Sequence, residues 1–341
     1  MDNSEVTIHD IAAILNIDSS TVSRALNDSP RVAKKTKAKI LKKAAELGYQ
    51  RNHLASNLRK SKTFTLGVIV PRISRHFFSS AIAGIEETAF KAGYTVIICQ
   101  SLESLEREQS IVKTLLANRV DGVLISISME TKNYNHLLGL KQRNIPYVFF
   151  DRHCNIKENS NVVIYDFDAA FKATQHLIDQ KSKTIAHFSG PQNLEIYKNR
   201  FEGYKNALKK NNITFKEELV FTSSLMENDG VENVEKMMNL PYKIDGLFCA
   251  NDVVAIGAIK YLKEINIKIP KDIAIVGFSN ESISSVIEPA LSTINQSGFE
   301  IGETATKLLL DKIESKKNQQ NHKTIIVKTS LIERKSSLRK A

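Results

Sequence analysis

Residues 7–27 constrain the fold of this chain more than any other stretch, because they predict two short helices joined by a tight turn. The stretch reads Thr-Ile-His-Asp-Ile-Ala-Ala-Ile-Leu-Asn-Ile-Asp-Ser-Ser-Thr-Val-Ser-Arg-Ala-Leu-Asn. Its first apolar residues recur at helical spacing, at Ile8, Ile11, Ala12 and Leu15. Thr7 can cap the first helix, with Asp10 three residues later. After a turn at Asn16-Ile17, Asp18 can cap the second helix, so the pattern predicts a helix-turn-helix.

The second predicted helix is apolar on one side, at Val22, Ala25 and Leu26, and polar on the other. The polar side carries Ser19, Ser20, Thr21, Ser23, Arg24 and Asn27. Small polar side chains can approach phosphates and base edges, and an arginine can bind O6 and N7 of guanine together. We therefore expect this helix to enter the major groove of DNA. A polar surface helix without a DNA partner is the alternative.

The positive charge of the chain is concentrated at the same end. Residues 1–62 hold 12 Lys and Arg against 6 Asp and Glu, a net +6 of the formal +11 carried by the whole chain. A basic block attached to a less charged body indicates a polyanionic partner.

A third helix is predicted over residues 32–47, with Gly48 as its stop. Its apolar face consists of Ile40, Leu41, Ala44 and Leu47. Residues 50–63 then form a basic linker that holds at most one or two helical turns, a marginal length in water. We expect this linker to be disordered in the free protein.

Three segments resemble the DNA-binding domain of the lac/gal repressor family: Val6–Ala12, Ser20–Asn27 and Leu47–Tyr49. The resemblance implies a cytoplasmic, homodimeric bacterial repressor that binds a palindromic double-stranded operator and answers to a small molecule. It implies DNA contacts from Thr7, from the polar residues of the second helix, and from Tyr49. It also implies a hinge helix in the linker that orders on DNA, with contacts from Asn52, Ala55 and Leu58. Leu58 would wedge between base pairs in the minor groove.

From Phe64 onward, short apolar strands alternate with amphipathic helices. The first series has strands at 66–70, 93–99, 122–126 and 147–151, and the second has strands at 162–164, 185–188, 219–221, 246–249 and 273–278. This alternation predicts two doubly wound, mainly parallel sheets, and therefore two α/β lobes with a cleft between them. With the small all-α domain in front, the resemblance implies a body like that of periplasmic binding proteins.

We place the domain boundaries at 1–50 for the helix-turn-helix domain, 51–63 for the hinge, and 64–341 for the effector-binding and dimerisation domain. The resemblance implies three passages of the chain between the lobes, near 162–165, 290–294 and 323–328. Lobe one then spans about 64–162 and 293–323, and lobe two about 163–292 and 324–341.

Polar and aromatic residues at the carboxyl ends of the predicted strands are the candidate effector-binding residues, since ligands of such sheets bind there. Predicted strands are followed directly by Ser126, Asp151, Asn251 and Ser279. The helix after the first strand opens with Phe77 and Phe78, and the helix after Phe188 carries Arg200. By resemblance Asp151, Arg200 and Asn251 match effector-binding positions, whereas Asp252 could instead cap its helix. Many family members have an aspartate after the pair that is Gly277-Phe278 here, but this chain has Ser279. Known family ligands therefore cannot be carried over.

Other classes of function lack support in the sequence. No dinucleotide, P-loop, zinc-protease or hydrolase motif is present, and the three cysteines have no metal-ligand spacing. We therefore expect no enzyme activity, no cofactor and no metal. The N-terminus is not a signal peptide, and no apolar run is long enough to span a membrane. The C-terminus lacks leucine heptads, which favours a dimer over a tetramer.

The predicted function is a repressor of carbohydrate-utilisation genes controlled by a sugar-like effector bound between the lobes. Two alternatives stay open at this point. One is a regulator that answers to a purine or to a phosphorylated carrier protein. The other, from a different class, is a free-standing sugar-binding protein, which residues 1–60 argue against.

Overall fold

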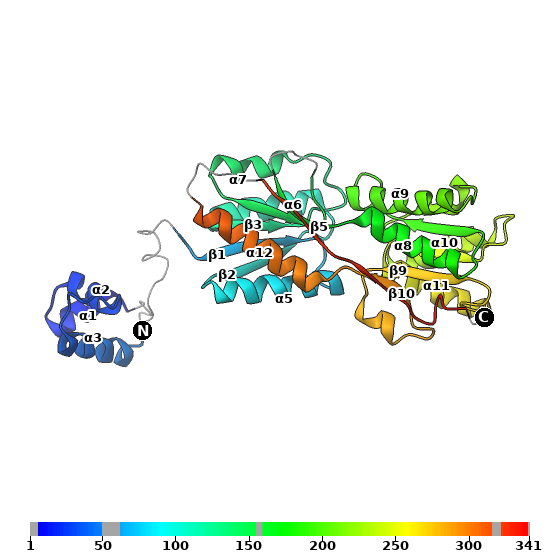
Figure 1. Ribbon diagram of the computed structural model, residues 1–341. Coiled ribbons are helices and arrows are strands. Elements are labelled where there is room, and N and C mark those ends of the chain that lie inside the picture. The colour runs from blue at the N-terminus through cyan, green and yellow to red at the C-terminus, as the bar shows by residue number, and fades with distance from the viewer. Residues whose placement is uncertain (1–5, 50–61, 155–158, 316–321, 340–341) are drawn as a thin grey trace. The chain divides into compact units, whose positions relative to one another are not determined.

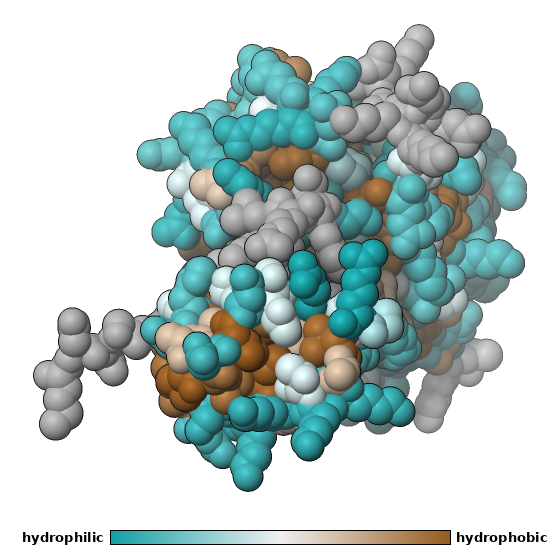
Figure 2. Space-filling model, turned by 90° about the vertical axis from the view of Figure 1, so that its left-hand side faces the viewer, coloured by the Kyte–Doolittle hydropathy of each residue, from teal (hydrophilic) through white to brown (hydrophobic). Residues whose placement is uncertain are grey.

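Figure 1 shows the computed structural model, which describes residues 6–49, 62–154, 159–315 and 322–339. The chain divides into two compact units, Met1–Thr63 and Phe64–Ala341. The face seen in Figure 2 is mostly hydrophilic, with hydrophobic areas between the polar side chains. In the described ranges, no helix is both long enough and apolar enough to cross a membrane.

The described part of the N-terminal unit contains three helices, α1 (Ile8–Leu15), α2 (Ser19–Leu26) and α3 (Lys34–Glu46). Ile11, Val22 and Ile40, one from each helix, are fully buried and form the centre of its core. The capping box of Thr7 and Asp10 and the Asp18 cap are present as predicted. Ala33 offers no side-chain cap to α3. Leu41 was predicted on the apolar face of α3 but is 45% exposed. The buried face of α3 is therefore narrower than the spacing of its apolar residues indicated.

The first lobe is built on a six-stranded parallel sheet in the order β11-β5-β4-β3-β1-β2. The strands are β1 (Thr65–Val70), β2 (Thr95–Gln100), β3 (Gly122–Ile125), β4 (Tyr147–Phe150), β5 (Ser160–Ile164) and β11 (Thr324–Val327). The helices are α5 (His76–Lys91), α6 (Leu105–Ala117), α7 (Leu138–Gln142) and α12 (Gly298–Glu314). Buried residues of α5 and α12 pack on one face of the sheet, and those of α6 and α7 pack on the other.

The second lobe repeats this plan with the strand order β12-β10-β9-β8-β6-β7, in which only β12 is antiparallel. The strands are β6 (Ile185–Ser189), β7 (Val220–Thr222), β8 (Gly246–Cys249), β9 (Ala274–Phe278), β10 (Ser292–Asn295) and β12 (Ser330–Ile332). The helices are α8 (Asp166–Asp179), α9 (Glu195–Lys210), α10 (Glu227–Met238) and α11 (Asp252–Glu264). The predicted architecture of two mainly parallel sheets is therefore confirmed.

The lobe boundaries differ from those predicted by a few residues. All of β5 lies in the first sheet, between β4 and β11. β10 at 292–295 pairs in the second sheet, and β11 at 324–327 returns to the first. The chain consequently passes between the lobes at 165, 296–297 and 328–329. These boundaries depend on pairing between strands distant in sequence, which periodicity cannot show. Helix α12 was not predicted at all.

Three helix pairs pack so closely that backbone touches backbone: α5 with α12, α8 with α9, and α10 with α11. A Cβ atom at Gly84 of α5 would come closer than 3.0 Å to the carbonyl oxygen of Phe299. One at Gly302 of α12 would collide in the same way with the carbonyl oxygen of Ala81. The other two pairs have equally tight positions at Gly203, Gly230 and Gly257. Within each lobe, neighbouring helices are thus in contact at positions where only glycine fits.

The core of the second lobe contains a buried histidine. His187 has no exposed surface and stacks between Phe248 and Tyr204, with ring centroids 4.8 and 5.0 Å away. Its Nδ1 lies 3.0 Å from the carbonyl oxygen of Phe248, and its Nε2 has no partner among the described residues. Burial lowers the pKa of His187 to about 4.

His187 should therefore make folding sensitive to acid. The pKa of His187 is lower in the folded protein than in the unfolded chain. The contribution of neutral His187 to the free energy of unfolding is therefore complete above about pH 6.5. It is lost at about 1.4 kcal/mol per pH unit as the pH falls towards about 4. His187→Phe should reduce the acid-side slope of unfolding free energy against pH by this amount. Urea unfolding of both proteins across this range measures the slopes, and parallel slopes would contradict the prediction.

Candidate functional site

The polar residues of α2 lie on its outer surface. Ser20, Arg24 and Asn27 are exposed and follow one another at helical spacing along one face. The remaining three, Ser19, Thr21 and Ser23, are half-buried. The amide of Asn27 donates to the carbonyl of Ser23 at 2.7 Å and so closes the end of the helix. This surface of the N-terminal unit presents hydroxyl and guanidinium groups to solvent.

The other predicted DNA contacts have different positions. The Thr7 hydroxyl donates to Asp10 at 2.7 Å within the cap of α1, while the residue itself stays exposed. Tyr49 is half-buried against the core of the N-terminal unit. Asn52, Ala55 and Leu58 lie outside the described residues.

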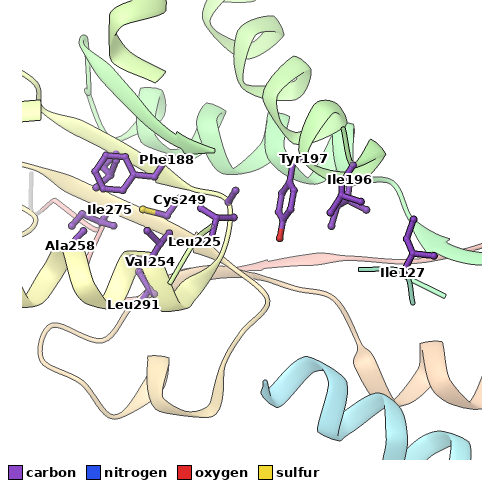
Figure 3. Packing of buried hydrophobic residues seen from close by; sticks show 14 of the residues in the cluster. Ile127, Phe188, Ile196, Tyr197, Leu225, Cys249, Val254, Ala258, Ile275 and Leu291 are labelled. Atoms are coloured by element: carbon purple, nitrogen blue, oxygen red, sulfur yellow. The ribbon is translucent and has the colours of Figure 1, made fainter. Parts of the chain in front are cut away.

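A pocket lies between the two lobes, at the carboxyl ends of the strands. Six of the seven predicted effector residues line it: Phe77, Phe78, Asp151, Arg200, Asn251 and Ser279. Ser126 does not line it but is fully buried behind it, where its hydroxyl donates to Asp151 at 3.4 Å. Figure 3 shows Tyr197 and Ile196 at the start of α9, on the side towards Ile127 of the first lobe. The pocket is therefore bounded by both lobes.

Arg200 is the buried cation on the second-lobe side of the pocket. Its Nε donates to Asp166 at 2.8 Å and its Nη1 to the carbonyl of Ala250 at 2.8 Å. The guanidinium carbon lies 3.7 Å from the centroid of the Phe278 ring. Burial raises the pKa of Asp166 to about 6, an effect that Arg200 opposes. These contacts fix Arg200 in one orientation, with one edge towards the pocket.

Asp151 is the corresponding carboxylate on the first-lobe side. It follows β4, it has a positive φ of 60°, and it is 8% exposed. Burial raises its pKa, whereas Arg152 and Arg200 act in the opposite direction. Asp151 and Arg200 thus face one pocket from different lobes without forming an ion pair with each other. A ligand with hydroxyl groups could bridge them.

Asn251, rather than Asp252, caps α11. The Asn251 side chain accepts from the backbone N–H of Val254 at 2.9 Å and donates to the carbonyl of Leu225 at 3.0 Å. The buried Asp252 carboxylate instead accepts three hydrogen bonds from the loop and strand that follow β9: Thr293 at 2.6 Å, Ser284 at 2.7 Å and the backbone of Glu281 at 2.8 Å. The suggestion that Asp252 caps its helix is therefore wrong.

The sequence predictions missed an ion pair in the wall of the pocket. Arg152 donates to Glu103 at 2.7 Å and, across the cleft, contacts the Tyr197 hydroxyl at 3.5 Å. Both Arg152 and Tyr197 are nearly fully buried. Asp151 was selected because it follows a strand, and ligands of parallel sheets bind at the carboxyl ends of the strands. The same argument applies to its neighbour Arg152 and to Arg72 and Arg75 after β1, which also line the pocket.

The described residues contain no cluster of His, Cys, Asp or Glu that could hold a metal ion. The pocket is lined by arginines, carboxylates and aromatic rings. This composition suits a polar organic molecule better than a metal.

Comparisons with known proteins identify the family. Residues 7–52 match bacterial regulatory proteins of the lacI family, and residues 174–337 match a periplasmic binding protein-like domain. The ribose operon repressor of Halalkalibacterium halodurans is 32% identical over 312 residues, which cover 91% of this chain and 91% of that repressor. The chain belongs to the lacI family of bacterial regulatory proteins.

Other members of the lacI family agree with this. Catabolite control protein A of Priestia megaterium is 32% identical, with 89% of this chain and 91% of that protein covered. The lac repressor dimer bound to operator and the anti-inducer ONPF has a TM-score of 0.85 at 25% identity, covering 98% and 100% of the two chains. A family member from Enterococcus faecium with bound ribose has a TM-score of 0.70 at 27% identity, covering 81% and 100%. The chain is thus a DNA-binding transcription regulator, not an enzyme.

Proposed function

We propose that this lacI-family repressor controls carbohydrate-utilisation genes and that a sugar-like effector binds between its lobes. The protein works in the cytoplasm as a homodimer on operator DNA, as the family relationship indicates. Two identical subunits favour a palindromic operator. The observation that carries the effector proposal is the pocket that Asp151 and Arg200 line from different lobes.

Each side chain has a defined role in this proposal. Asp151 accepts hydroxyl hydrogen bonds, Arg200 donates from its fixed fork, and Phe77 and Phe78 offer ring surface. Asn251 and Ser279 contribute polar edges, and Ser126 orients Asp151. A ligand bound to both lobes favours one degree of closure, which gives the differential affinity needed to shift operator binding.

The test is to recover genomic fragments bound by the full-length protein and to titrate the complexes with sugars, nucleobases and sugar phosphates. We expect specific binding to at least one fragment and a change in its affinity with a sugar or sugar derivative. A response to nucleobases alone would replace the sugar proposal with a purine one. Absence of any specific fragment would contradict the assignment of α2 as the reading helix.

On the DNA side, we propose contacts from Thr7, Tyr49, the linker residues Asn52, Ala55 and Leu58, and the outward residues of α2. Arg24→Ala should cost about 1–3 kcal/mol of operator affinity if the guanidinium reads a guanine edge. Binding to random DNA should change much less. Arg31→Ala removes the same charge from an exposed position outside α2 and serves as the control. Equal losses on operator and random DNA would assign Arg24 to a phosphate.

A further inference from the structure

Two arginines stand at the mouth of the pocket, on the turn that follows β1. Arg72 and Arg75 are three residues apart, and the backbone N–H of Arg75 reaches the carbonyl of Arg72 at 3.5 Å. The turn is anchored by Gln100 of β2, which accepts from the backbone of Ile73 at 3.2 Å. Both arginines are half-buried and both line the pocket. The fold therefore brings two positive charges to one end of the site.

Among the residues that the structure describes, these two arginines form no ion pair, unlike the other two arginines in the pocket. Arg152 pairs with Glu103 and Arg200 with Asp166. Within the described residues, the hydrogen bond made by the Arg75 guanidinium goes to the sulfur of Met226 at 3.2 Å, and a thioether is a weak acceptor. Burial lowers the pKa of Arg75, Glu281 partly opposes this, and Arg72 adds to it.

The start of helix α5 adds to the positive potential at this end. Arg75 is itself the N-cap residue and provides no side-chain cap, so the first turn of this 16-residue helix depends on other acceptors. One of them is Glu281 of the second lobe, which accepts from the backbone N–H of His76 at 3.1 Å. Glu281 is thus bound to the start of the helix, and its carboxylate offsets part of the positive charge there.

We propose that Arg72 and Arg75 form an oxyanion subsite, and that the effector is a sugar derivative bearing a phosphate or carboxylate group. This inference rests on the proposed function, since it assumes that the pocket takes a sugar. The charged group lies against the two guanidinium groups and the start of α5, while the hydroxyl groups lie between Asp151 and Arg200. Bidentate recognition by arginine suits either oxyanion.

Titration calorimetry of the full-length protein with matched compounds tests this proposal. The sets are glucose, glucose 6-phosphate and glucuronate, and ribose with ribose 5-phosphate. We expect at least one anionic compound to bind about tenfold or more tightly than its neutral parent. Tighter binding of a sugar phosphate would indicate a phosphate ligand, and tighter binding of glucuronate would indicate a carboxylate ligand. The double variant Arg72→Gln/Arg75→Gln should lose that advantage yet keep its affinity for the neutral parent.

Arg107→Gln is the matched control, because Arg107 is an exposed arginine on α6 of the same lobe, outside the pocket. It should leave all affinities unchanged. Neutral sugars that bind as tightly as their charged derivatives, or a double variant that keeps the preference, would overturn the subsite and leave the sugar-responsive function intact. Failure of every compound in the panel to bind would overturn both proposals. Unchanged melting temperatures show that the variants are folded.

Discussion

Replacing Arg200 by alanine is expected to destabilise the second lobe by about 3–5 kcal/mol and to abolish the response to effector. The Asp166 carboxylate is 5% exposed and its ion-pair partner is Arg200, at 2.8 Å. Without the guanidinium it becomes an uncompensated buried charge. The carbonyl of Ala250 and the ring of Phe278 lose their contacts with Arg200 as well. Urea unfolding measures the stability, and operator titration with effector measures the response.

The companion substitution Asp166→Asn distinguishes the ionic effect from lost packing. Arg200→Ala/Asp166→Asn should be more stable than Arg200→Ala alone, since a neutral amide needs no counter-charge. In Arg200→Ala the folded pKa of Asp166 should rise further, so the stability loss relative to the wild type should be smallest in acid, where Asp166 is protonated, and should grow as the pH rises through that pKa. Arg143→Ala, at an exposed position, should change stability by less than about 0.5 kcal/mol. A stability loss in Arg200→Ala that is independent of pH would contradict the buried-charge explanation.

Gly302→Ala should have the second large effect, a decrease of about 3 kcal/mol in the free energy of unfolding. An added methyl group would meet the carbonyl oxygen, carbonyl carbon and Cα of Ala81, and backbone cannot swing aside as a side chain can. Helices α5 and α12 would have to separate along their contact. The gain of about 1 kcal/mol in helix propensity offsets only part of this cost. Thermal unfolding of the variant measures the net change.

Gly139→Ala provides the comparison for this change. Its new methyl group would meet only the Leu116 Cδ1 atom, the end of a flexible side chain, at 3.0 Å. We expect a change smaller than about 1 kcal/mol there. If both variants lose the same stability, the close helix contact is not what makes Gly302 intolerant of a side chain.

Local patterns account for most of what could be predicted from the sequence. The cap residues Thr7 and Asp18 locate α1 and α2, because capping involves residues only two or three positions apart. The strands from β1 to β9 follow from short apolar runs bounded by helices, whereas β10, β11 and β12 were not predicted. Asp151 and Asn251 were placed in one pocket from their positions at strand ends, without any knowledge of strand order, since parallel strands end at the same edge of a sheet. Arg200 lies within α9 and was selected by the resemblance to the family.

Long-range contacts are where the predictions failed. The Arg152–Glu103 pair joins residues 49 positions apart, and no periodic pattern records such a contact. Asn251 and Asp252 are adjacent polar residues, and which of them caps α11 depends on distant partners of Asp252 such as Ser284 and Thr293. Ser126 lies at a strand end as predicted, but its hydroxyl donates to Asp151 and it does not line the pocket.

The three passages of the chain between the lobes also set an order of events during synthesis. Among the described residues, the core of the N-terminal unit consists of residues up to Tyr49, and these leave the ribosome early. The first lobe lacks α12 and β11 until residue 327 has been made, and the second lacks β12 until residue 332. Neither lobe can close its hydrophobic core before nearly the whole chain has emerged. A chain interrupted before α12 would thus keep its DNA-reading helices while having no complete lobe through which an effector could release them.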